Sequence, residues 1–310
     1  MQVEEELARL SPGKDILLTI GVFDGVHLGH KRLISRLMEE AKRRGLFSGV
    51  ITFHQHPEEV ISPERGLPFI TSVKERARLL KNEGVSAIII LSFTRELANL
   101  SARQFVKLLK KHLGMRGLVL GPDFKLGRGR SGDIESLNAL GREMGFTVDV
   151  VPPVKINGEV VSSTGIRNVL GKGNMGKIQE LLGRSFSLSG CVVNGSGRGT
   201  ELGFPTANLD IPVGQALPAD GVYAAWVDFS GKIYRAMVNI GQNPTFDAGK
   251  HTVEVYILDY HGDLYGKELK IDIIKRLRGE KTFSNAGKLQ KQIEKDIEQG
   301  KAILKSARGK

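Results

Sequence analysis

Two histidines stand three residues apart in a glycine-rich segment, Gly21-Val-Phe-Asp-Gly-Val-His-Leu-Gly-His30. The segment follows an apolar run and precedes residues with helical spacing, so it joins the end of a strand to the start of a helix. Side chains three apart share a helix face, and a helix N-terminus offers unpaired N–H groups. His27 and His30 could therefore donate together to one phosphate chain. Two histidines that only pack or contact solvent are the alternative, and the motif alone leaves both open.

A second candidate for phosphate binding is Ser162-Ser-Thr-Gly-Ile-Arg167, which also opens a predicted helix. Serine and threonine at a helix start can act simply as caps. We place Arg167 in the first turn, where a cation opposes the helix macrodipole. A polyphosphate that neutralises the guanidinium would explain that position.

The second half of the chain has its own glycine-rich loop, with glycines at 195, 197, 199 and 203. Its spacing differs from that of a P-loop, and no long helix follows. The loop could wrap phosphates with backbone N–H groups, or it could be a flexible hairpin. In an extended segment Thr206 and Asn208 face the same way, and their two oxygens suit Mg²⁺.

The elements that must position these residues differ between the two halves. Short apolar runs alternate with amphipathic segments over residues 16–150, which predicts a doubly wound α/β domain with a parallel sheet. The expected strands there are 16–20, 49–53, 85–91, 117–120 and 147–151, and the expected helices are 31–44, 72–82, 101–112 and 132–144.

After Pro152-Pro153 the pattern changes to a helical pair, 164–170 and 175–182, followed by strand-rich segments. Strands are expected at 222–227, 233–238, 252–258 and 269–274, separated by glycine or asparagine turns. Their close spacing favours an antiparallel barrel or sandwich, with the domain boundary near Gly183. Apolar residues at 289, 293, 297, 303 and 304 predict a final helix that docks through one stripe.

Composition limits the classes of partner. The 45 lysines and arginines exceed the 34 acidic residues, for a net charge of +11, which favours anionic partners. Nucleic acid is one such partner, but zinc-finger spacing, RNP-type strands and basic heptads are all missing, so we expect none. One cysteine, an acidic amino end without an apolar stretch behind it and no run of about 20 apolar residues predict a cytoplasmic protein without a membrane span.

These motifs resemble those of the bacterial bifunctional riboflavin kinase and FAD synthetase family, within the H-x-G-H nucleotidyltransferases. The resemblance extends to Thr52-Phe-His-Gln-His-Pro-Glu58, Val119–Gly127, Gly203-Phe-Pro-Thr-Ala-Asn-Leu209, Leu217–Tyr223 and Leu277-Arg-Gly-Glu280. It implies a nucleotidyltransferase-type sheet domain at 1–183, and at 184–310 a six-stranded antiparallel barrel with a C-terminal helix.

The resemblance also implies the site residues. On the adenylyltransferase side, ATP would be bound by Gly21, Phe23, Asp24, Gly25, His27, His30, Ser162, Thr164 and Arg167, and FMN by His56, Pro57, Asp123 and Phe124. On the kinase side, ATP would be bound by Gly197, Arg198, Gly203, Pro205, Thr206 and Asn208, and the flavin by Glu254, Leu277 and Arg278. Glu254, His27 and His30 would be catalytic, with Mg²⁺ on Thr206 and Asn208.

The two implied reactions make different demands. Riboflavin attacks through a neutral hydroxyl, so phosphorylation needs a base such as Glu254, although strand periodicity alone favours an exposed glutamate there. The FMN phosphate is already an anion, so adenylylation needs alignment and charge neutralisation but no base. ATP, riboflavin and FMN are the expected small molecules, with FAD as product and homo-oligomers and apo-flavoproteins as further possible partners. An adenylyltransferase for another phosphorylated substrate, with the barrel as a binding module, is the second alternative.

Overall fold

The computed structural model describes residues 2–62, 64, 66–195, 198–242 and 251–307. The chain divides into two compact units, Met1–Ser163 and Thr164–Lys310, which we describe separately. None of the helices in the described ranges is long and apolar enough to span a membrane.

The first unit is built on a five-stranded sheet in the order β3-β2-β1-β4-β5, and all its neighbours are parallel. Its strands are β1 (Ile16–Ile20), β2 (Phe47–Phe53), β3 (Ala87–Leu91), β4 (Met115–Leu120) and β5 (Thr147–Val150). Its helices are α1 (Gln2–Arg9), α2 (Leu28–Arg43), α3 (Pro57–Ile61), α4 (Val73–Asn82), α5 (Arg95–Asn99), α6 (Ala102–Leu113) and α7 (Ile134–Met144), with a short 3₁₀ helix η2 (Arg128–Arg130). A small hairpin, β6 (Lys155–Ile156) and β7 (Glu159–Val160), follows. The predicted doubly wound parallel sheet is confirmed.

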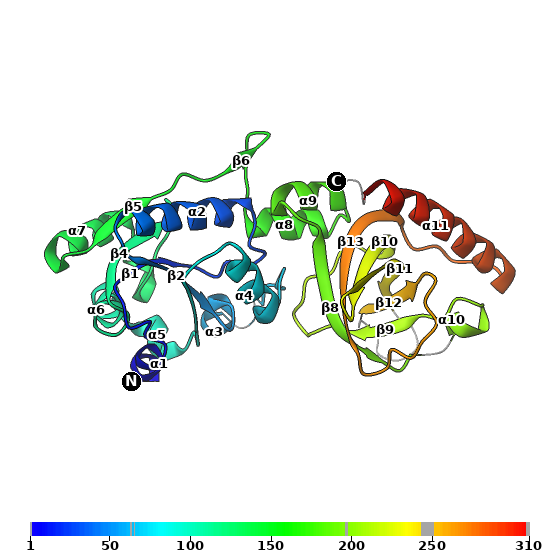
Figure 1. The fold of residues 1–310 in the computed structure, drawn as a ribbon, viewed down its shortest axis with the longest axis horizontal. Coiled ribbons are helices and arrows are strands. Elements are labelled where there is room, and N and C mark those ends of the chain that lie inside the picture. The colour runs from blue at the N-terminus through cyan, green and yellow to red at the C-terminus, as the bar shows by residue number, and fades with distance from the viewer. Residues whose placement is uncertain (1, 63, 65, 196–197, 243–250, 308–310) are drawn as a thin grey trace. The chain divides into compact units, whose positions relative to one another are not determined.

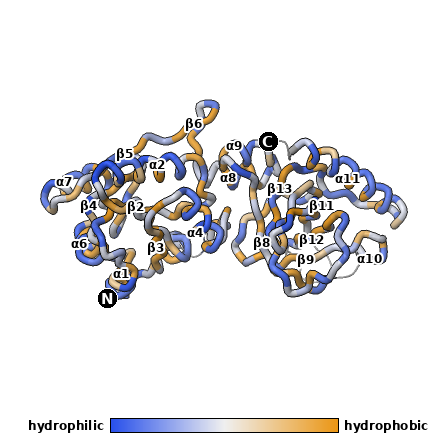
Figure 2. Tube along the Cα trace, in the orientation of Figure 1, coloured by the Kyte–Doolittle hydropathy of each residue, from blue (hydrophilic) through white to orange (hydrophobic). Residues whose placement is uncertain are grey.

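Helices cover both faces of this sheet because its strands are apolar on both sides. Leu17 of β1 packs in one core with α2 and α4, whereas Ile16 and Leu18 pack in another with α1, α5 and α6. Figure 1 shows α2 on one side of the sheet and α6 with α1 on the other. Hydrophobic residues accordingly gather on the strands, while polar residues alternate with apolar ones along the helices (Figure 2).

The second unit is a closed barrel whose six strands run in the order β10-β11-β12-β9-β8-β13, all antiparallel, with β13 pairing back to β10. The strands are β8 (Phe186–Val193), β9 (Ala207–Asp210), β10 (Gly221–Phe229), β11 (Lys232–Gln242), β12 (His251–Ile257) and β13 (Glu268–Arg278). The helices are α8 (Ser163–Leu170), α9 (Met175–Leu182), the short α10 (Arg198–Glu201) and α11 (Ala286–Ala307). This confirms the predicted six-stranded barrel with a C-terminal helix.

The barrel strands alternate between two environments. Every second residue of β12, from Val253 to Ile257, is buried. The opposite faces of β10 and β11 pack against the final helix, where Ala224 and Met237 contact Ile297 and Leu304. The predicted apolar stripe of α11 is therefore confirmed, and α11 covers one side of the barrel (Figure 1).

Candidate functional sites

Three neighbouring strands of the first unit end beside one another and carry predicted site residues. The loop after β1 holds residues 21–27, the loop after β2 leads to His56, and the loop after β4 holds Asp123 and Phe124. In the order β3-β2-β1-β4-β5, β2 and β3 are added on one side of β1, and β4 and β5 on the other, so the strand order switches sides between β1 and β4. Ligands of open α/β sheets bind at such a point, outside the carboxyl ends of the strands.

The loop between β1 and α2 has an unusual backbone. Phe23 and Val26 adopt positive φ angles of 53° and 39°, which are rare for residues with a side chain. Gly25 has a φ of 81° and donates its N–H to Thr71 Oγ1 at 3.0 Å. Strain of this kind persists only where the surroundings hold it, and it gathers at functional sites.

Asp24 is one of the groups that hold this loop. Its buried carboxylate accepts hydrogen bonds from the backbone N–H groups of Ile70 and Thr71 at 3.0 Å. Its carbonyl oxygen accepts from Ser163 Oγ at 2.9 Å, which places Ser162 and the end of the first unit beside the loop. Asp24 therefore fixes the backbone.

His27 and His30 lie together, as their spacing predicted. Their rings stack with centroids 3.6 Å apart and an interplanar angle of 18°. His27 is the N-cap of α2, and its Nδ1 accepts from the His30 backbone N–H at 3.3 Å, so the proton of the neutral ring belongs on Nε2. His30 Nδ1 is buried and has no hydrogen-bond partner in the described part of the chain. An orphaned polar atom in such a place is typical of a site built for a ligand.

Burial holds the pKa of His30 well below its usual value of 6.5, with further lowering by the nearby His27 and Arg76. His30 stays neutral in the folded state, whereas in the unfolded chain it takes up a proton. The free energy of unfolding therefore decreases as the pH is lowered. We expect acidification below about pH 6.5 to lower the free energy of unfolding, with a contribution from His30 of at most ~1.4 kcal/mol per pH unit. Denaturation followed by circular dichroism at several pH values should show a shallower dependence in His30→Gln, and an unchanged slope would contradict this.

The residues predicted for the flavin side follow β2 and β4. His56 is the N-cap of α3, with Pro57 at the first helical position, and its Nδ1 accepts from the Glu58 N–H at 3.2 Å. Asp123 is exposed, whereas Phe124 is half-buried and packs against the core. Their assignment to FMN stays a prediction.

In contrast to our prediction from the sequence, Arg167 does not lie in the first turn of its helix. Arg167 lies in the last turn of α8, an eight-residue helix, where a cation complements the macrodipole. The helix therefore needs no bound anion to accommodate it. Thr164 and Arg167 belong to the second compact unit, and their role in phosphate binding rests on the motif alone.

Gly29 allows the His27 ring and the Val161 carbonyl oxygen to lie close to the start of α2. A Cβ at this position would lie 3.0 Å from His27 Cε1 and 3.3 Å from the Val161 carbonyl oxygen. We expect Gly29→Ala to displace the His27 ring and to slow adenylyl transfer about tenfold or more, since small misplacements have large kinetic effects.

Gly176→Ala is the matched control, because Gly176 is also the second residue of its helix. A Cβ added there would lie 3.7 Å from Asn174 Oδ1, which is ordinary van der Waals contact. Steady-state rates of FAD formation would measure both variants. Equal rates in Gly29→Ala and the wild-type protein would contradict the expectation.

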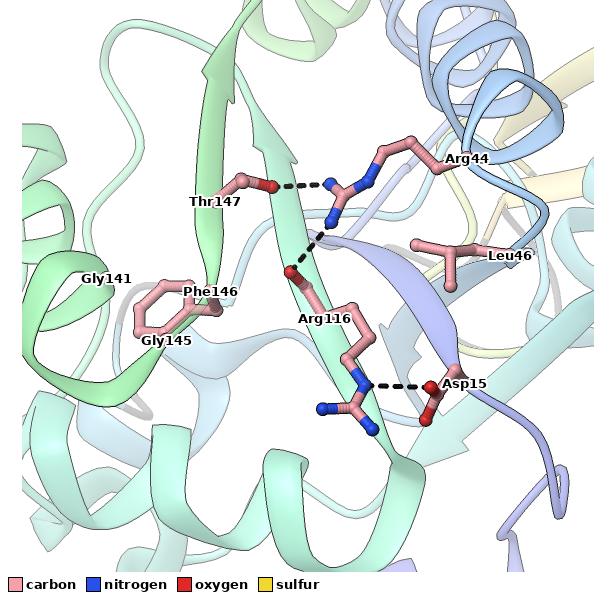
Figure 3. A pocket seen from close by; sticks show the side chains of 8 residues that line it. All are labelled: Asp15, Arg44, Leu46, Arg116, Gly141, Gly145, Phe146 and Thr147. Atoms are coloured by element: carbon pink, nitrogen blue, oxygen red, sulfur yellow. Dashed lines mark hydrogen bonds and ion pairs between the residues drawn. The ribbon is translucent and has the colours of Figure 1, made fainter.

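A pocket also lies at the opposite edge of the sheet, lined in part by Asp15, Arg44, Arg116 and Thr147 (Figure 3). Its guanidinium groups are engaged by the protein: Arg44 donates to Thr147 Oγ1 and to the Arg116 carbonyl oxygen, and Arg116 pairs with Asp15 at 2.9 Å. These residues lie near the amino ends of the strands. The pocket is therefore separate from the edge that carries the predicted residues.

In the second unit, a pocket of about 680 Å³ opens over the barrel wall. One row of directly paired residues crosses five neighbouring strands there: Asn208 faces Glu254, Glu254 faces Asn239, Asn239 faces Val222 and Val222 faces Arg278. All five line the pocket. Directly paired Cβ atoms in antiparallel strands lie about 4.5–5.5 Å apart, so the Glu254 carboxylate is within reach of Asn208.

The glycine loop fits closely around the proposed magnesium ligands. Thr206 and Asn208 both line the pocket. A Cβ at Gly195 would lie 1.9 Å from Asn208 Nδ2, and one at Gly199 would lie 3.0 Å from Thr206 Oγ1. Only glycine allows this approach of backbone to side chain.

Other predicted kinase residues are placed differently. Gly197 lies outside the described residues, and Arg198 begins α10. Gly203 and Pro205 are exposed and are not part of the pocket wall, while Leu277 packs against the apolar cluster beneath α11.

Sequence reasoning missed Asp296, which α11 brings into the pocket wall. Asp296 is 3% exposed, and it binds Arg278 through Nε and Nη2, both at 2.9 Å. Gln292 donates to the same carboxylate at 2.8 Å, and the Arg278 guanidinium lies 5.8 Å from the centre of the Phe283 ring. Asp296 lies seven residues after Leu289 and three after Ile293, so helical spacing places it on the apolar stripe, and an acidic residue on that stripe was the signal.

Comparisons with known proteins match both units of the chain. The FAD synthetase family model matches residues 11–165, and the riboflavin kinase family model matches residues 182–304. A bifunctional riboflavin kinase/FMN adenylyltransferase from Escherichia coli K12 is 37% identical over 288 residues, covering 92% of each chain. The enzymes of that name from Pseudomonas fluorescens and Bacillus subtilis are 36% identical over 98% and 32% identical over 90% of each chain.

Among solved structures, the crystal structure of a macrolide-efflux protein from Streptococcus pneumoniae superposes with a TM-score of 0.87. It is 32% identical in sequence, and the match covers 96% of both chains. The whole fold is therefore shared with a solved protein. The two family models and the full-length relatives together show that this chain belongs to the family of bifunctional riboflavin kinases and FMN adenylyltransferases.

Proposed function

We propose that the chain makes FAD from riboflavin in two ATP-dependent steps, with one step in each unit. The barrel pocket phosphorylates riboflavin to FMN, and the carboxyl edge of the sheet adenylylates FMN and releases pyrophosphate. The observation that carries the proposal is the pairing of Glu254 with Asn208 in the wall of one pocket. A carboxylate next to metal-type oxygen donors is what phosphorylation of a neutral alcohol requires.

In the kinase step, Glu254 accepts the proton of the terminal ribityl hydroxyl. The hydroxyl oxygen then bonds to the γ-phosphorus of ATP while the bond to the β-phosphate bridging oxygen breaks, which gives FMN and ADP. Arg278 lines the same pocket and is held in place by its ion pair with Asp296. The barrel therefore supplies a base and a fixed guanidinium, and riboflavin supplies the alcohol.

Thr206 and Asn208 are the residues that would hold Mg²⁺. Their donors are neutral oxygens, which fits a cation that brings its own phosphate ligands. No cluster of three or more histidine, cysteine or acidic side chains that could hold a metal is present in the described ranges. When bound, Mg²⁺ would neutralise charge on the ATP phosphates.

In the adenylyl step, the FMN phosphate attacks the α-phosphorus of ATP and pyrophosphate leaves. His27 Nε2 and the N–H groups at the start of α2 donate to the charge that develops there. His30 stacks on His27 and fixes its ring. The reaction needs no carboxylate base, because the attacking phosphate is already ionised at neutral pH.

Chromatography of a reaction with riboflavin, ATP and Mg²⁺ tests the proposal. We expect FMN to appear first and FAD to follow. Unchanged riboflavin with folded protein would refute the kinase assignment, and FMN that accumulates without FAD would refute the adenylyl assignment. Other phosphorylated compounds, supplied in place of FMN, would test whether the sheet unit adenylylates a different substrate.

Three further parts of the proposal have separate tests. A cytoplasmic location, association into homo-oligomers and transfer of FAD to apo-flavoproteins stay predictions. Cell fractionation, light scattering and reconstitution of an apo-flavoprotein would examine them in turn.

A further inference from the structure

A fully buried arginine lies beneath the adenylyl-transfer loop. Arg76 of α4 is 0% exposed and lies three and four residues before Leu79 and Leu80, so it shares the buried face of this helix. Burial lowers the pKa of Arg76, and the Asp24 carboxylate opposes that shift. A buried guanidinium needs an explanation, because taking its charge out of water is costly.

Its hydrogen bonds tie two strand ends together. Arg76 Nη1 donates to the Val22 carbonyl oxygen at 2.9 Å, and Nη2 donates to the Phe53 carbonyl oxygen. Val22 lies in the loop that leads to His27, and Phe53 is the last residue of β2, three residues before His56. One side chain thus links the segments predicted to bind ATP and FMN.

The Asp24 carboxylate favours the charged form of Arg76. No carboxylate forms an ion pair with it in the described part of the chain, and its Nε is buried without a hydrogen-bond partner there. The Asp24 oxygens already accept from the Ile70 and Thr71 backbone. A neutral donor could serve the two carbonyls, so the charge itself calls for a function. A positive charge beneath this loop favours the binding of anions such as phosphates.

We propose that Arg76 is a positioning residue of the adenylyl-transfer site, which holds the loops carrying His27 and His56 together. The inference rests on the proposed function of this edge. The groups that act on His30 are the His27 imidazole at the start of α2, the Phe23 ring at 5.0 Å and Arg76 from α4. With Arg76 present, protonation of His30 is disfavoured, so its imidazole stays neutral beside His27.

Two substitutions in the full-length protein separate the roles of geometry and charge. Arg76→Met removes both the hydrogen bonds and the charge. Arg76→Lys keeps the charge but cannot donate to the Val22 and Phe53 carbonyl oxygens at the same time. We expect FAD formation from FMN to lose at least tenfold in kcat in Arg76→Met and to a smaller degree in Arg76→Lys. FMN formation by the barrel in the same samples should stay within twofold. The NMR titration of His30, assigned with His30→Gln, should move to higher pH in Arg76→Met only.

Arg78→Met is the control, because Arg78 lies on the same helix but pairs with Glu75 at the surface. It should keep both activities within twofold. The inference is overturned if folded Arg76→Met makes FAD at the wild-type rate, or if its loss comes without a change in the His30 titration. If Arg76→Met does not fold, wild-type FAD formation by Arg76→Lys would overturn the inference, because lysine cannot bind both carbonyl oxygens as arginine does. Wild-type protein that makes no FAD would instead refute the proposed function.

Discussion

Replacement of Glu254 by Gln is expected to lower kcat for FMN formation about 10³-fold, while FAD formation from supplied FMN survives. Gln keeps the shape of the side chain but cannot accept the hydroxyl proton, and general-base catalysis typically contributes 10²–10⁴-fold. The row from Asn208 to Asn239 should keep the amide in place, so KM for riboflavin should change little. Initial rates with riboflavin and with FMN as alternative acceptors measure the two activities separately.

Two glutamates serve as comparisons for this prediction. Glu201 is exposed on α10 and outside the pocket wall, so Glu201→Gln should leave both activities intact. Glu280 does line the pocket, and its carboxylate fills the space that a Cβ at Gly241 would take. If Glu254→Gln stays active and Glu280→Gln does not, the base is Glu280 and our assignment is wrong.

The converse result is expected for His30→Ala, which should lower FAD formation about 10²-fold or more and spare FMN formation. Removal of the ring takes away the partner on which His27 stacks and a donor near the phosphates. Loss of one preorganised donor to developing charge costs about 10²–10³ in kcat. Single-turnover adenylylation of FMN would show that the chemical step, not product release, has slowed.

His261→Ala provides the comparison, because His261 is exposed in the turn between β12 and β13. Both activities should persist in that variant. If His30→Ala lowered FMN and FAD formation equally, the loss would reflect general unfolding, and the separation of the two sites would be refuted.

The opposite outcomes of these two substitutions follow from the acceptors. An alcohol must lose a proton before it attacks, whereas an FMN phosphate is already ionised. One unit therefore needs a carboxylate and the other needs donors and positive charge. The two sites meet these different needs with different residues. The carboxylate of Glu254 lies in the barrel pocket, and the imidazoles of His27 and His30 lie at the sheet edge.

Some elements escaped the sequence patterns for identifiable reasons. The α1 helix is short and acidic, and only Val3 and Leu7 are buried, so its periodicity is weak. The β9 strand has four residues and gains its structure from β8 and β12 on either side. Such short segments depend on tertiary partners more than on intrinsic propensity.

The sequence by itself determined the class of each unit, the histidine pair and the shared face of Thr206 and Asn208, whereas Glu254 was predicted only from the family resemblance. Strand and helix periods are local, and a three-residue or two-residue spacing already fixes which side chains share a face. Side chains that share one face because of their spacing can therefore be predicted without knowledge of the fold.

Only the tertiary structure decided which distant residues meet. Glu254 and Asn208 are 46 positions apart, and the register of β12 with β9 pairs them. Asp296 and Arg76 are charged residues on the apolar faces of α11 and α4, and both are buried. Burial of a charge depends on partners far along the chain, namely Arg278 for Asp296 and the carbonyls of Val22 and Phe53 for Arg76. No local spacing encodes such contacts, because packing selects them only after the strands and helices have assembled.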